Sequence, residues 1–357
     1  MWQAGGRRPG HAHPEERQEG RTLKVVIANF SRPIRRTLDF RSYWRQHTKP
    51  ETRPRVSLFE QRPDWGFHIY ALGVYLMDLG LADQAEFWDY AEERSMKYRR
   101  NGALRVLFWN EDDIRAYLDR HGDPDLFINY GRYGEPMLDH FAGRCFRIHI
   151  PCERWRGGTA SAECYLVDSE ADVGARCMLY VPVVNTRKIF PTDGPTHRDF
   201  IYLAAVYPQK RHDLLLDAIR GTELTGHLHP VEASQLDLHD TRVTTSNWNE
   251  RDVVELLRTS RIAVYPGDRT SNPAAMWECV AAGLPMVMNE NIEGGKHLVV
   301  PGITGEFANE HNFADVMRYV LERRGTYAPR EYFEAHWDTV TMLERYLAFF
   351  RDMGWTP

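Results

Sequence analysis

The sequence predicts an α/β protein made of two doubly wound, Rossmann-like domains that face a central cleft. Short apolar runs alternate with stretches of helical periodicity, which is typical of a parallel sheet covered by helices. The alternation stops at a Pro-, Asp-, Gly- and Thr-containing stretch, 191–197, and then begins again. A length of 357 residues also fits two domains of the usual ~100–200 residues. Ligands of such sheets bind at the carboxyl ends of the strands, which is where we expect the site.

The first domain is assigned to residues 21–190. It follows a tail, 1–20, that has almost no apolar residues and is expected to be disordered. Strands are expected at its short apolar runs, which are 23–28, 104–108, 126–128, 145–150, 164–167 and 178–181. Helices are expected at 66–81 and 111–120, the first because its apolar residues recur at helical spacing.

The second domain is assigned to residues 197–330, and the last segment to residues 331–357. The second set of elements comprises strands at 200–206, near Val243, at 262–265 and at 285–288, and helices at 213–219, 250–259 and 273–282. One long helix, 332–353, is expected at the end of the chain, because its apolar residues share one face. That face should dock against another part of the molecule.

Composition favours a soluble protein of the cytoplasm. Apolar runs stay far below the ~20 residues of a membrane span, and no hydrophobic secretion segment opens the sequence. A net charge of −5 gives no general attraction for nucleic acid. An anionic acceptor such as a lipid, polysaccharide or nucleic acid stays open, because arginines cluster in one loop, although such loops are more often simply solvated. These are Arg32, Arg35, Arg36, Arg41, Arg45, Arg53, Arg55 and Arg62.

Neither a metal nor a cofactor is expected. The five cysteines are odd in number and contain no CxxC pair, so they suggest neither a disulfide framework nor a zinc site. The acidic run 111–113 begins a predicted helix, whereas carboxylates that hold a divalent metal against phosphates would lie at a strand end. The sequence therefore predicts a metal-independent protein.

A series of motifs from Val181 onward resembles one enzyme family. The segment 181–191, VPVVNTRKIFP, looks like the interdomain segment of the retaining GT-B glycosyltransferases of family four, which include sucrose synthases and bacterial mannosyltransferases. The resemblance covers roughly residues 23–355, with its specific motifs in 181–307. It implies the GT-B fold, transfer of a sugar from a nucleotide-sugar donor with retention of configuration, and a last helix that crosses back to the first domain.

The stretch 206–218, VYPQKRHDLLLDA, resembles the family's strand end that presents a lysine, here Lys210, to the donor diphosphate. A lysine ammonium there would neutralise the charge that develops on the leaving group. Ala205 stands where the family has an arginine, and Arg211 or Arg269 is the candidate substitute. The alternative interpretation of Lys210 is a solvated lysine on a loop.

The strongest motif is the segment 262–288, which resembles the family's strand, glycine/proline loop, helix and small-residue turn. Glu278 matches the second of the family's two acidic residues, and a carboxylate there can accept hydrogen bonds from both ribose hydroxyls. Thr270 stands in the place of the first acidic residue. The free amides and dipole of the helix N-terminus suit phosphate, and the residues that would form it are Asn272, Pro273 and Ala274.

Gly294, Gly295 and Lys296 resemble the family's diglycine loop, where glycine lets the backbone approach a ligand closely. Lys296 would add a cation near the phosphates. In the amino-terminal half, Trp65 and Gly66 resemble the loop that closes over the donor diphosphate.

His149, at the end of a strand, matches a histidine that contacts the transferred sugar in the family. A packed core histidine is the equal alternative. Asn129, Tyr130 and Arg132 end another strand and are expected to point to the same cleft.

The resemblance therefore implies a hexosyltransferase-type glycosyltransferase that uses a nucleotide sugar, a UDP- or GDP-sugar first of all, with Lys210, His149 and Glu278 as its catalytic residues. Two alternatives stay open. One is a degenerate GT-B protein that binds a nucleotide sugar or a partner without turnover, which Thr270 and Ala205 favour. The other is a nucleotide-sugar epimerase of similar fold. The acceptor is not specified by the sequence.

Overall fold

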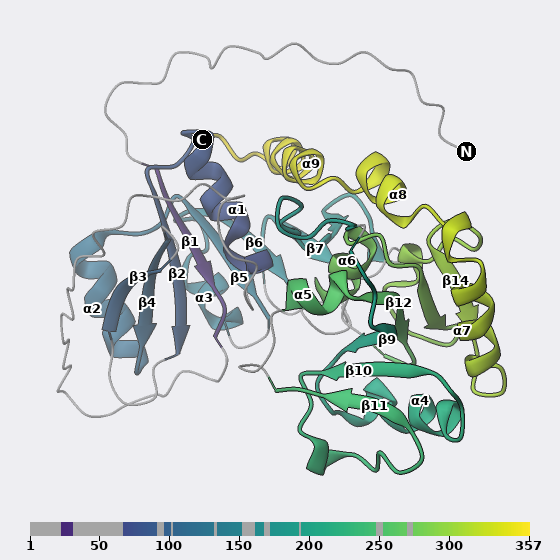
Figure 1. Ribbon diagram of the computed structural model, residues 1–357. Helices are drawn as coiled ribbons and strands as arrows, with labels where there is room; N and C mark the ends of the chain where they lie inside the picture. Colours follow the sequence, from purple (N-terminus) through teal and green to yellow (C-terminus); the bar gives the residue numbers. More distant parts are fainter. Residues whose placement is uncertain are drawn as a thin grey trace.

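The computed structural model of the chain forms two β-sheets, each layered with helices (Figure 1). Among the strands that the structure describes, every ladder is parallel except the one that adds an edge strand to the first sheet. The structure describes residues 23–30, 67–90, 96–100, 103–131, 134–151, 161–167, 172–192, 194–247, 253–269 and 274–357. The prediction of two Rossmann-like α/β domains is confirmed, whereas the domain boundaries stay predictions, and the tail 1–20 lies outside the described residues.

The first sheet has the order β3-β4-β2-β1-β5-β6-β7-β8. Because β1 pairs with β2 on one side and β5 on the other, the chain reverses its direction of winding at β1. Its strands are β1 (Lys24–Ala28), β2 (Gln84–Tyr90), β3 (Met96–Arg100), β4 (Ala103–Phe108), β5 (Leu126–Tyr130), β6 (Phe146–Ile150), β7 (Cys164–Val167) and β8 (Cys177–Leu179). Its helices are α1 (Phe67–Asp78), α2 (Glu111–His121) and α3 (Glu135–His140).

The second sheet has the order β11-β10-β9-β12-β13-β14, which is the 3-2-1-4-5-6 order of a dinucleotide-binding sheet. Its winding reverses at β9, which lies between β10 and β12. The strands are β9 (Arg198–Leu203), β10 (Thr225–His229), β11 (Arg242–Thr245), β12 (Ser260–Tyr265), β13 (Met286–Asn289) and β14 (Gly305–Ala308). The helices are α4 (His212–Ile219), α5 (Val253–Arg258), α6 (Ala274–Ala281) and α7 (Phe313–Glu322).

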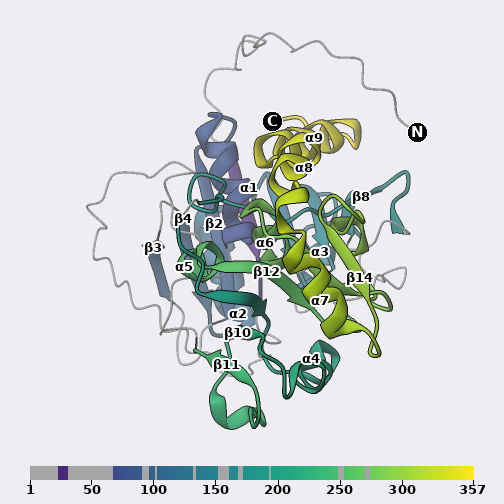
Figure 2. The same cartoon turned by 45° about the vertical axis from the view of Figure 1, so that its right-hand side comes forward.

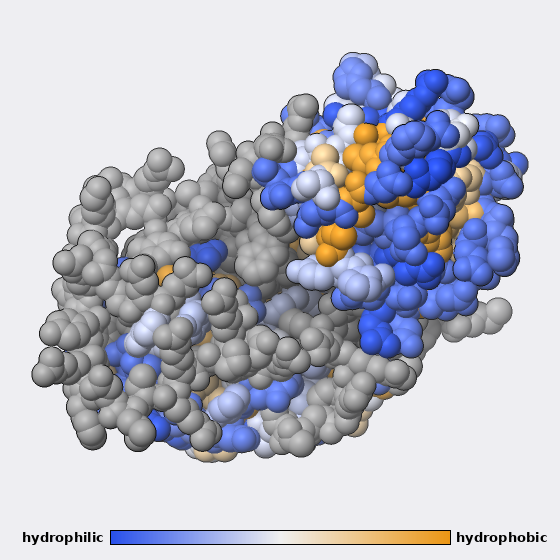
Figure 3. All heavy atoms as spheres, turned by 90° about the horizontal axis from the view of Figure 1, so that it is seen from below, coloured by the Kyte–Doolittle hydropathy of each residue, from blue (hydrophilic) through white to orange (hydrophobic). Residues whose placement is uncertain are grey.

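The edge strand β11 alternates exposed and half-buried side chains, as a strand with one solvated face does. Seen from below, the surface of this part of the molecule is mostly hydrophilic, with a hydrophobic band across it (Figure 3).

The prediction of one long final helix is wrong. The segment forms two helices, α8 (Pro329–His336) and α9 (Thr339–Asp352). The helical segment is interrupted at Trp337 and Asp338. The Asp338 carboxylate caps α9 by accepting hydrogen bonds from the amides of Val340 and Thr341, at 3.1 and 3.2 Å. Helical periodicity alone does not reveal this break, because the apolar residues on both sides of it are spaced as in one helix.

Helix α9 is tied to the segment that leaves β8. The Thr339 hydroxyl donates to the Val184 carbonyl oxygen at 2.7 Å, and the Tyr346 hydroxyl donates to that of Val181 at 3.0 Å. Burial raises the pKa of Tyr75 on α1, and the nearby carboxylates of Glu344 and Asp338 add to the shift. Helix α9 therefore lies beside α1 (Figure 2).

Candidate functional site

Three loops meet at the carboxyl edge of the second sheet, where its winding reverses. They follow β9, β12 and β13. The Asp268 amide donates to the Gln209 carbonyl oxygen at 3.1 Å, and the Glu293 amide donates to that of Asp268 at 2.8 Å. The Asn289 side chain adds a hydrogen bond of 3.0 Å to the carbonyl oxygen of Pro266. The edge at which such sheets bind ligands is thus built as one connected unit.

Lys210 ends a short 3₁₀ turn, Pro208–Lys210, directly after β9. Its ammonium lies 3.2 Å from the Tyr265 hydroxyl and 5.4 Å from the centre of the Tyr265 ring. The Tyr202 hydroxyl donates to the Lys210 carbonyl oxygen at 2.6 Å. Burial lowers the pKa of Lys210 to about 8, so that the side chain keeps its positive charge at pH 7.

The loop after β12 approaches this turn so closely that glycine is required. A Cβ atom on Gly267 would lie 2.9 Å from the Gln209 carbonyl oxygen and 3.4 Å from the Lys210 Cα. Any larger residue would push the turn away from β12. The position of the lysine therefore depends on the packing of two loops that are distant in the sequence.

Glu278 lies on α6, the helix that follows β12, and its side chain is partly buried. Burial raises the pKa of this carboxyl to about 7. Within the part of the chain that the structure describes, its carboxylate has neither a hydrogen bond nor an ion pair. A carboxylate that is partly desolvated without a donor is costly for the fold, and it is well placed to accept hydroxyl groups of a ligand.

The two arginines that could replace the charge missing at Ala205 both face carboxylates. The Arg211 Nε lies 3.2 Å from a carboxylate oxygen of Asp213, and the Arg269 Nε lies 3.3 Å from one of Glu293. Both pairs are largely exposed, so their mutual stabilisation is small.

The diglycine segment is a turn with positive φ angles, 89° at Gly294 and 73° at Gly295. The 3₁₀ turn η5 (Lys296–Leu298) follows, and the Lys296 side chain is exposed. The described part of α6 begins at Ala274, and its role at a helix end that binds phosphate stays a prediction. The other predicted site residues lie outside the described residues, namely Trp65, Gly66, Asn272 and Pro273, as do Thr270 and Arg132.

His149 lies near the end of β6 and is 2% exposed. Its Nδ1 is 3.0 Å from the Asn129 amide nitrogen, and its Nε2 is 3.5 Å from a carboxylate oxygen of Glu135. Because an amide nitrogen only donates, Nδ1 accepts and the neutral ring carries its hydrogen on Nε2. Burial lowers the pKa of His149 to about 4. The side chain thus belongs to a hydrogen-bonded unit inside the first domain. Tyr130, the last residue of β5, is half-buried.

Sequence reasoning missed Tyr265 and Tyr202, which hold the side chain and the backbone of Lys210. A signal was present at Tyr265, because a tyrosine that ends a buried strand and precedes Pro266 and Gly267 has its hydroxyl at the strand's carboxyl end.

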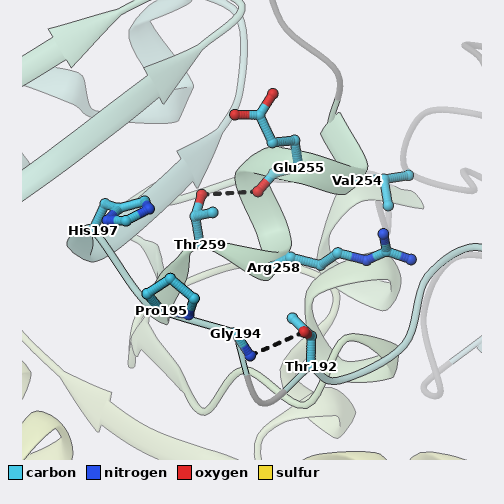
Figure 4. A pocket seen from close by; sticks show the side chains of 8 residues that line it. All are labelled: Thr192, Gly194, Pro195, His197, Val254, Glu255, Arg258 and Thr259. Atoms are coloured by element: carbon cyan, nitrogen blue, oxygen red, sulfur yellow. Dashed lines mark hydrogen bonds between the residues drawn. The ribbon is translucent and has the colours of Figure 1, made fainter.

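A separate hollow of about 260 Å³ lies beside α5 (Figure 4). Its wall includes His197, which precedes β9, and Thr259, which donates to the Glu255 carbonyl oxygen at 2.8 Å. The hollow is therefore at the amino end of β9, whereas Lys210 follows the carboxyl end. The complete lining is Thr192, Gly194, Pro195, His197, Val254, Glu255, Arg258 and Thr259.

None of the described helices combines the length and apolar character needed to cross a bilayer. The described residues also contain no group of three or more His, Cys, Asp or Glu side chains that could hold a metal ion.

Comparisons with known proteins place this architecture. The sequence matches no family model and no curated protein. Three solved structures are similar over almost their whole length, the first being a sucrose-phosphate synthase from Thermosynechococcus elongatus with a TM-score of 0.68 and 11% identity, a match that covers 93% of this chain and 99% of that chain. A glycosyltransferase from Rickettsia africae has a TM-score of 0.63 and 11% identity, and the match covers 93% of this chain and 98% of that chain. HepE from Anabaena, in complex with UDP and glucose, has a TM-score of 0.60 and 12% identity, and the match covers 92% of this chain and 100% of that chain. At such identities the likeness concerns the fold, and the chain has the two-domain GT-B fold.

Proposed function

We propose that this protein is a glycosyltransferase that moves a sugar from a nucleotide sugar, a UDP- or GDP-sugar, to an acceptor hydroxyl. The observation that carries the proposal is the partly buried carboxylate of Glu278, which has no partner among the described residues and lies on the helix after β12. The Lys210 ammonium lies in the loop that follows the adjacent strand, β9, within 3.2 Å of the Tyr265 hydroxyl at the end of β12. A nucleoside diphosphate complements this pair, because it combines anionic phosphates with a ribose that carries two hydroxyls.

The chemistry follows from these charges. The bond between the anomeric carbon and the diphosphate oxygen breaks, and its electron pair leaves with that oxygen. Lys210, Lys296 and the free amides of α6 stabilise the resulting charge. The acceptor hydroxyl forms the new bond to the anomeric carbon, and its proton passes to the departing diphosphate, whose oxygen has gained the electron pair. We propose retention of configuration and no metal requirement on the strength of the family resemblance. The HepE structure, a complex with UDP and glucose, favours a nucleotide sugar as the donor.

Binding without turnover is a second candidate. Ala205 leaves one expected cation out, and Arg211 and Arg269, its possible substitutes, face carboxylates. A weakly stabilised leaving group would slow transfer more than it would weaken binding of the ribose.

The test is a panel of uridine, guanosine, adenosine and thymidine diphosphate sugars, with thermal unfolding and release of nucleoside diphosphate measured in parallel. A ligand at 100 times its dissociation constant adds about 2.7 kcal/mol to the free energy of unfolding. We expect one uridine or guanosine donor to stabilise the protein and to release its diphosphate.

The other results separate the alternatives. Stabilisation without release favours the binding protein. Conversion of the donor to an epimer without any acceptor favours the epimerase. If no nucleotide sugar stabilises the protein, the proposal is wrong.

A further inference from the structure

Three aromatic rings from three separate elements pack against one another beside residues of the candidate site. Trp277 comes from α6, His297 from η5 and Trp337 from the junction between α8 and α9. The ring centres are 5.4 Å apart for Trp277 and His297, 5.9 Å for His297 and Trp337, and 5.4 Å for the two tryptophans. We call these three residues the ring cluster.

The ring cluster is adjacent in sequence to both proposed donor-binding side chains that follow β12 and β13. Trp277 immediately precedes Glu278, and His297 immediately follows Lys296. A displacement of either ring is therefore transmitted to a residue that we expect to touch the donor.

Trp337 lies where the chain passes from one anchored helix to another. Helix α8 is fixed to the second domain and to the segment that leaves β8, because one Arg330 nitrogen donates hydrogen bonds of 2.7 Å to the Ala281 carbonyl oxygen and 3.0 Å to that of Ile189. Helix α9 is fixed to the same segment, through the hydrogen bond of Thr339 to Val184. Only Trp337 and Asp338 separate these helices, so a change in the angle between α8 and α9 is made at Trp337, within the ring cluster.

Two atoms of the ring cluster are buried without a partner. They are Nε2 of His297 and Nε1 of Trp337, neither of which has a hydrogen bond in the described structure. Buried polar atoms without a partner are rare in folded proteins, and each calls for a physical reason. These two are chemically complementary, because an indole nitrogen can only donate, and an imidazole with its hydrogen on Nδ1 can only accept at Nε2.

Burial lowers the pKa of His297 to about 4, so the ring is neutral at pH 7 and keeps an accepting nitrogen. With ring centres 5.9 Å apart, the two nitrogens come within hydrogen-bond distance if a rotation at the junction turns them toward each other.

We propose that His297 is a positioning residue: once a nucleotide sugar is bound and the α8–α9 junction turns, the Trp337 indole donates a hydrogen bond to His297 Nε2, and this bond holds Lys296 and Glu278 in place for transfer. The inference rests on the proposed function, since it needs a donor to position. Its ligand would be the donor already proposed, and the new element is the pair of residues that aligns it.

The first experiment compares His297→Phe and Trp337→Phe, which keep an aromatic ring but remove the acceptor or the donor. Trp355→Phe is the matched control, because this buried tryptophan packs on Phe350 outside the ring cluster. We expect both test variants to release nucleoside diphosphate about tenfold more slowly at saturating donor, with a donor KM within about twofold of wild type. The double variant should be no slower than the slower single variant, because both remove the same bond.

Thermal unfolding of the ligand-free variants separates positioning from a structural role. His297→Phe removes an unpaired buried nitrogen at similar side-chain volume, so its midpoint should stay equal to that of wild type or rise, whereas Trp337→Phe also loses volume and should lower the midpoint no more than Trp355→Phe does. Loss of turnover together with a lower midpoint in both variants would indicate damaged packing and overturn the inference.

The second experiment observes the bond without turnover. In protein with ¹⁵N-labelled tryptophan, the indole signal that Trp337→Phe removes is assigned to Trp337. We expect saturation with uridine or guanosine diphosphate, whichever stabilises the protein, to shift this signal in wild type and not in His297→Phe.

The outcomes distinguish the two proposals. A wild-type protein that binds and turns over a donor, with an unshifted Trp337 signal and unaffected variants, overturns the inference and leaves the proposed function intact. A water that permanently bridges His297 Nε2 and Trp337 Nε1 would also leave the signal unshifted, and that result too overturns the inference. A wild-type protein that binds no nucleotide overturns both.

Discussion

The two sheets share the same strand order around the point where their winding reverses, yet they treat the polar side chains there differently. In the first sheet, Asn129 and His149 are hydrogen-bonded to each other and are almost closed to solvent. In the second, Lys210 is held by a tyrosine hydroxyl, and Glu278 has no described partner. Topology thus provides the position, and the partners decide whether the side chain serves the fold or remains available to a ligand.

The free-energy cost of the charge that each side chain carries at neutral pH differs in the same way. Burial keeps His149 neutral, so this side chain fits its surroundings without charge. At neutral pH, Lys210 and Glu278 are instead near their pKa values of about 8 and about 7, and each charged form is penalised by burial. A ligand that supplies phosphate and hydroxyl groups recovers that penalty, which the fold alone does not.

The largest expected effect is on the rate of sugar transfer, when Lys210 in the second domain is replaced. Lys210→Ala should lower the rate of diphosphate release by about 10²–10³-fold, the size seen when one group that stabilises a developing charge is removed. Lys188→Ala, which removes an exposed lysine, is the control and should behave as wild type. Single-turnover measurement with the best donor tests this, and equal rates for both variants would contradict the site.

Replacing His149, which is closed to solvent in the first domain, should instead lower the free energy of unfolding. His149→Ala leaves a cavity and removes the acceptor of the Asn129 amide, so the free energy of unfolding should fall by about 2–3 kcal/mol. Urea titration measures this change, and Lys210→Ala should lose no stability, because burial already penalises the charged ammonium in the folded state. Full stability with lost activity would instead assign His149 to the transferred sugar.

Glu278→Gln should raise the donor KM about tenfold, because a charged acceptor for two hydroxyls becomes a neutral one. The folded-state pKa of this carboxyl is raised, so its charge destabilises the fold fully above pH 7 and not below the unfolded value of 4.5. The variant should therefore be more stable than wild type by about 1–2 kcal/mol at pH 8 and equal to it at pH 4.5. Glu322→Gln, on the exposed end of α7, is the matched control.

The pH dependence should be bell-shaped. As pH falls through about 7, Glu278 gains a proton and loses its charge, and as pH rises through about 8, Lys210 loses its proton. The kcat/KM for the donor should be greatest between these values and about tenfold lower one unit beyond either. Glu278→Gln should remove the acidic limb alone, and a limb that persists in this variant would belong to another group.

The smallest expected effect concerns the partner of the lysine. Tyr265→Phe removes the hydroxyl that accepts from the Lys210 ammonium, so kcat/KM should fall about threefold. Phenylalanine retains the ring, which packs edge-on to Tyr202, so stability should change little. A loss as large as that of Lys210→Ala would give the hydroxyl itself a direct role.

Most strands were predictable because parallel strands that are covered on both faces are apolar throughout. β1 and β12 each contain such an apolar run, at 25–28 and 262–265, and both strands are found within two residues of the predicted range. The strand β2 was missed because Glu86 interrupts its apolar run. This carboxylate is 1% exposed and accepts hydrogen bonds from Trp88 and Tyr117, at 2.8 and 2.9 Å.

The strand β10 was missed for the same reason. His227 and His229 are buried because the Ser246 hydroxyl lies 2.8 and 3.0 Å from their rings. A sequence read locally shows a polar residue but not the distant group that makes its burial possible. The candidate site divides in the same way: the motifs identify Lys210 and Glu278, whereas the contact of Lys210 with Tyr265 depends on two strands being neighbours.

The return of α9 to the segment that leaves β8 has a consequence for how the protein is made. The contact between Tyr346 and Val181 closes 165 residues of chain, and α9 leaves the ribosome after every described strand of the second sheet. The first domain therefore waits throughout synthesis of the second for the groups that cover its exit segment. A nascent chain halted before Thr339 exposes apolar surface that chaperones recognise, and the exit segment is covered only once α9 has been made.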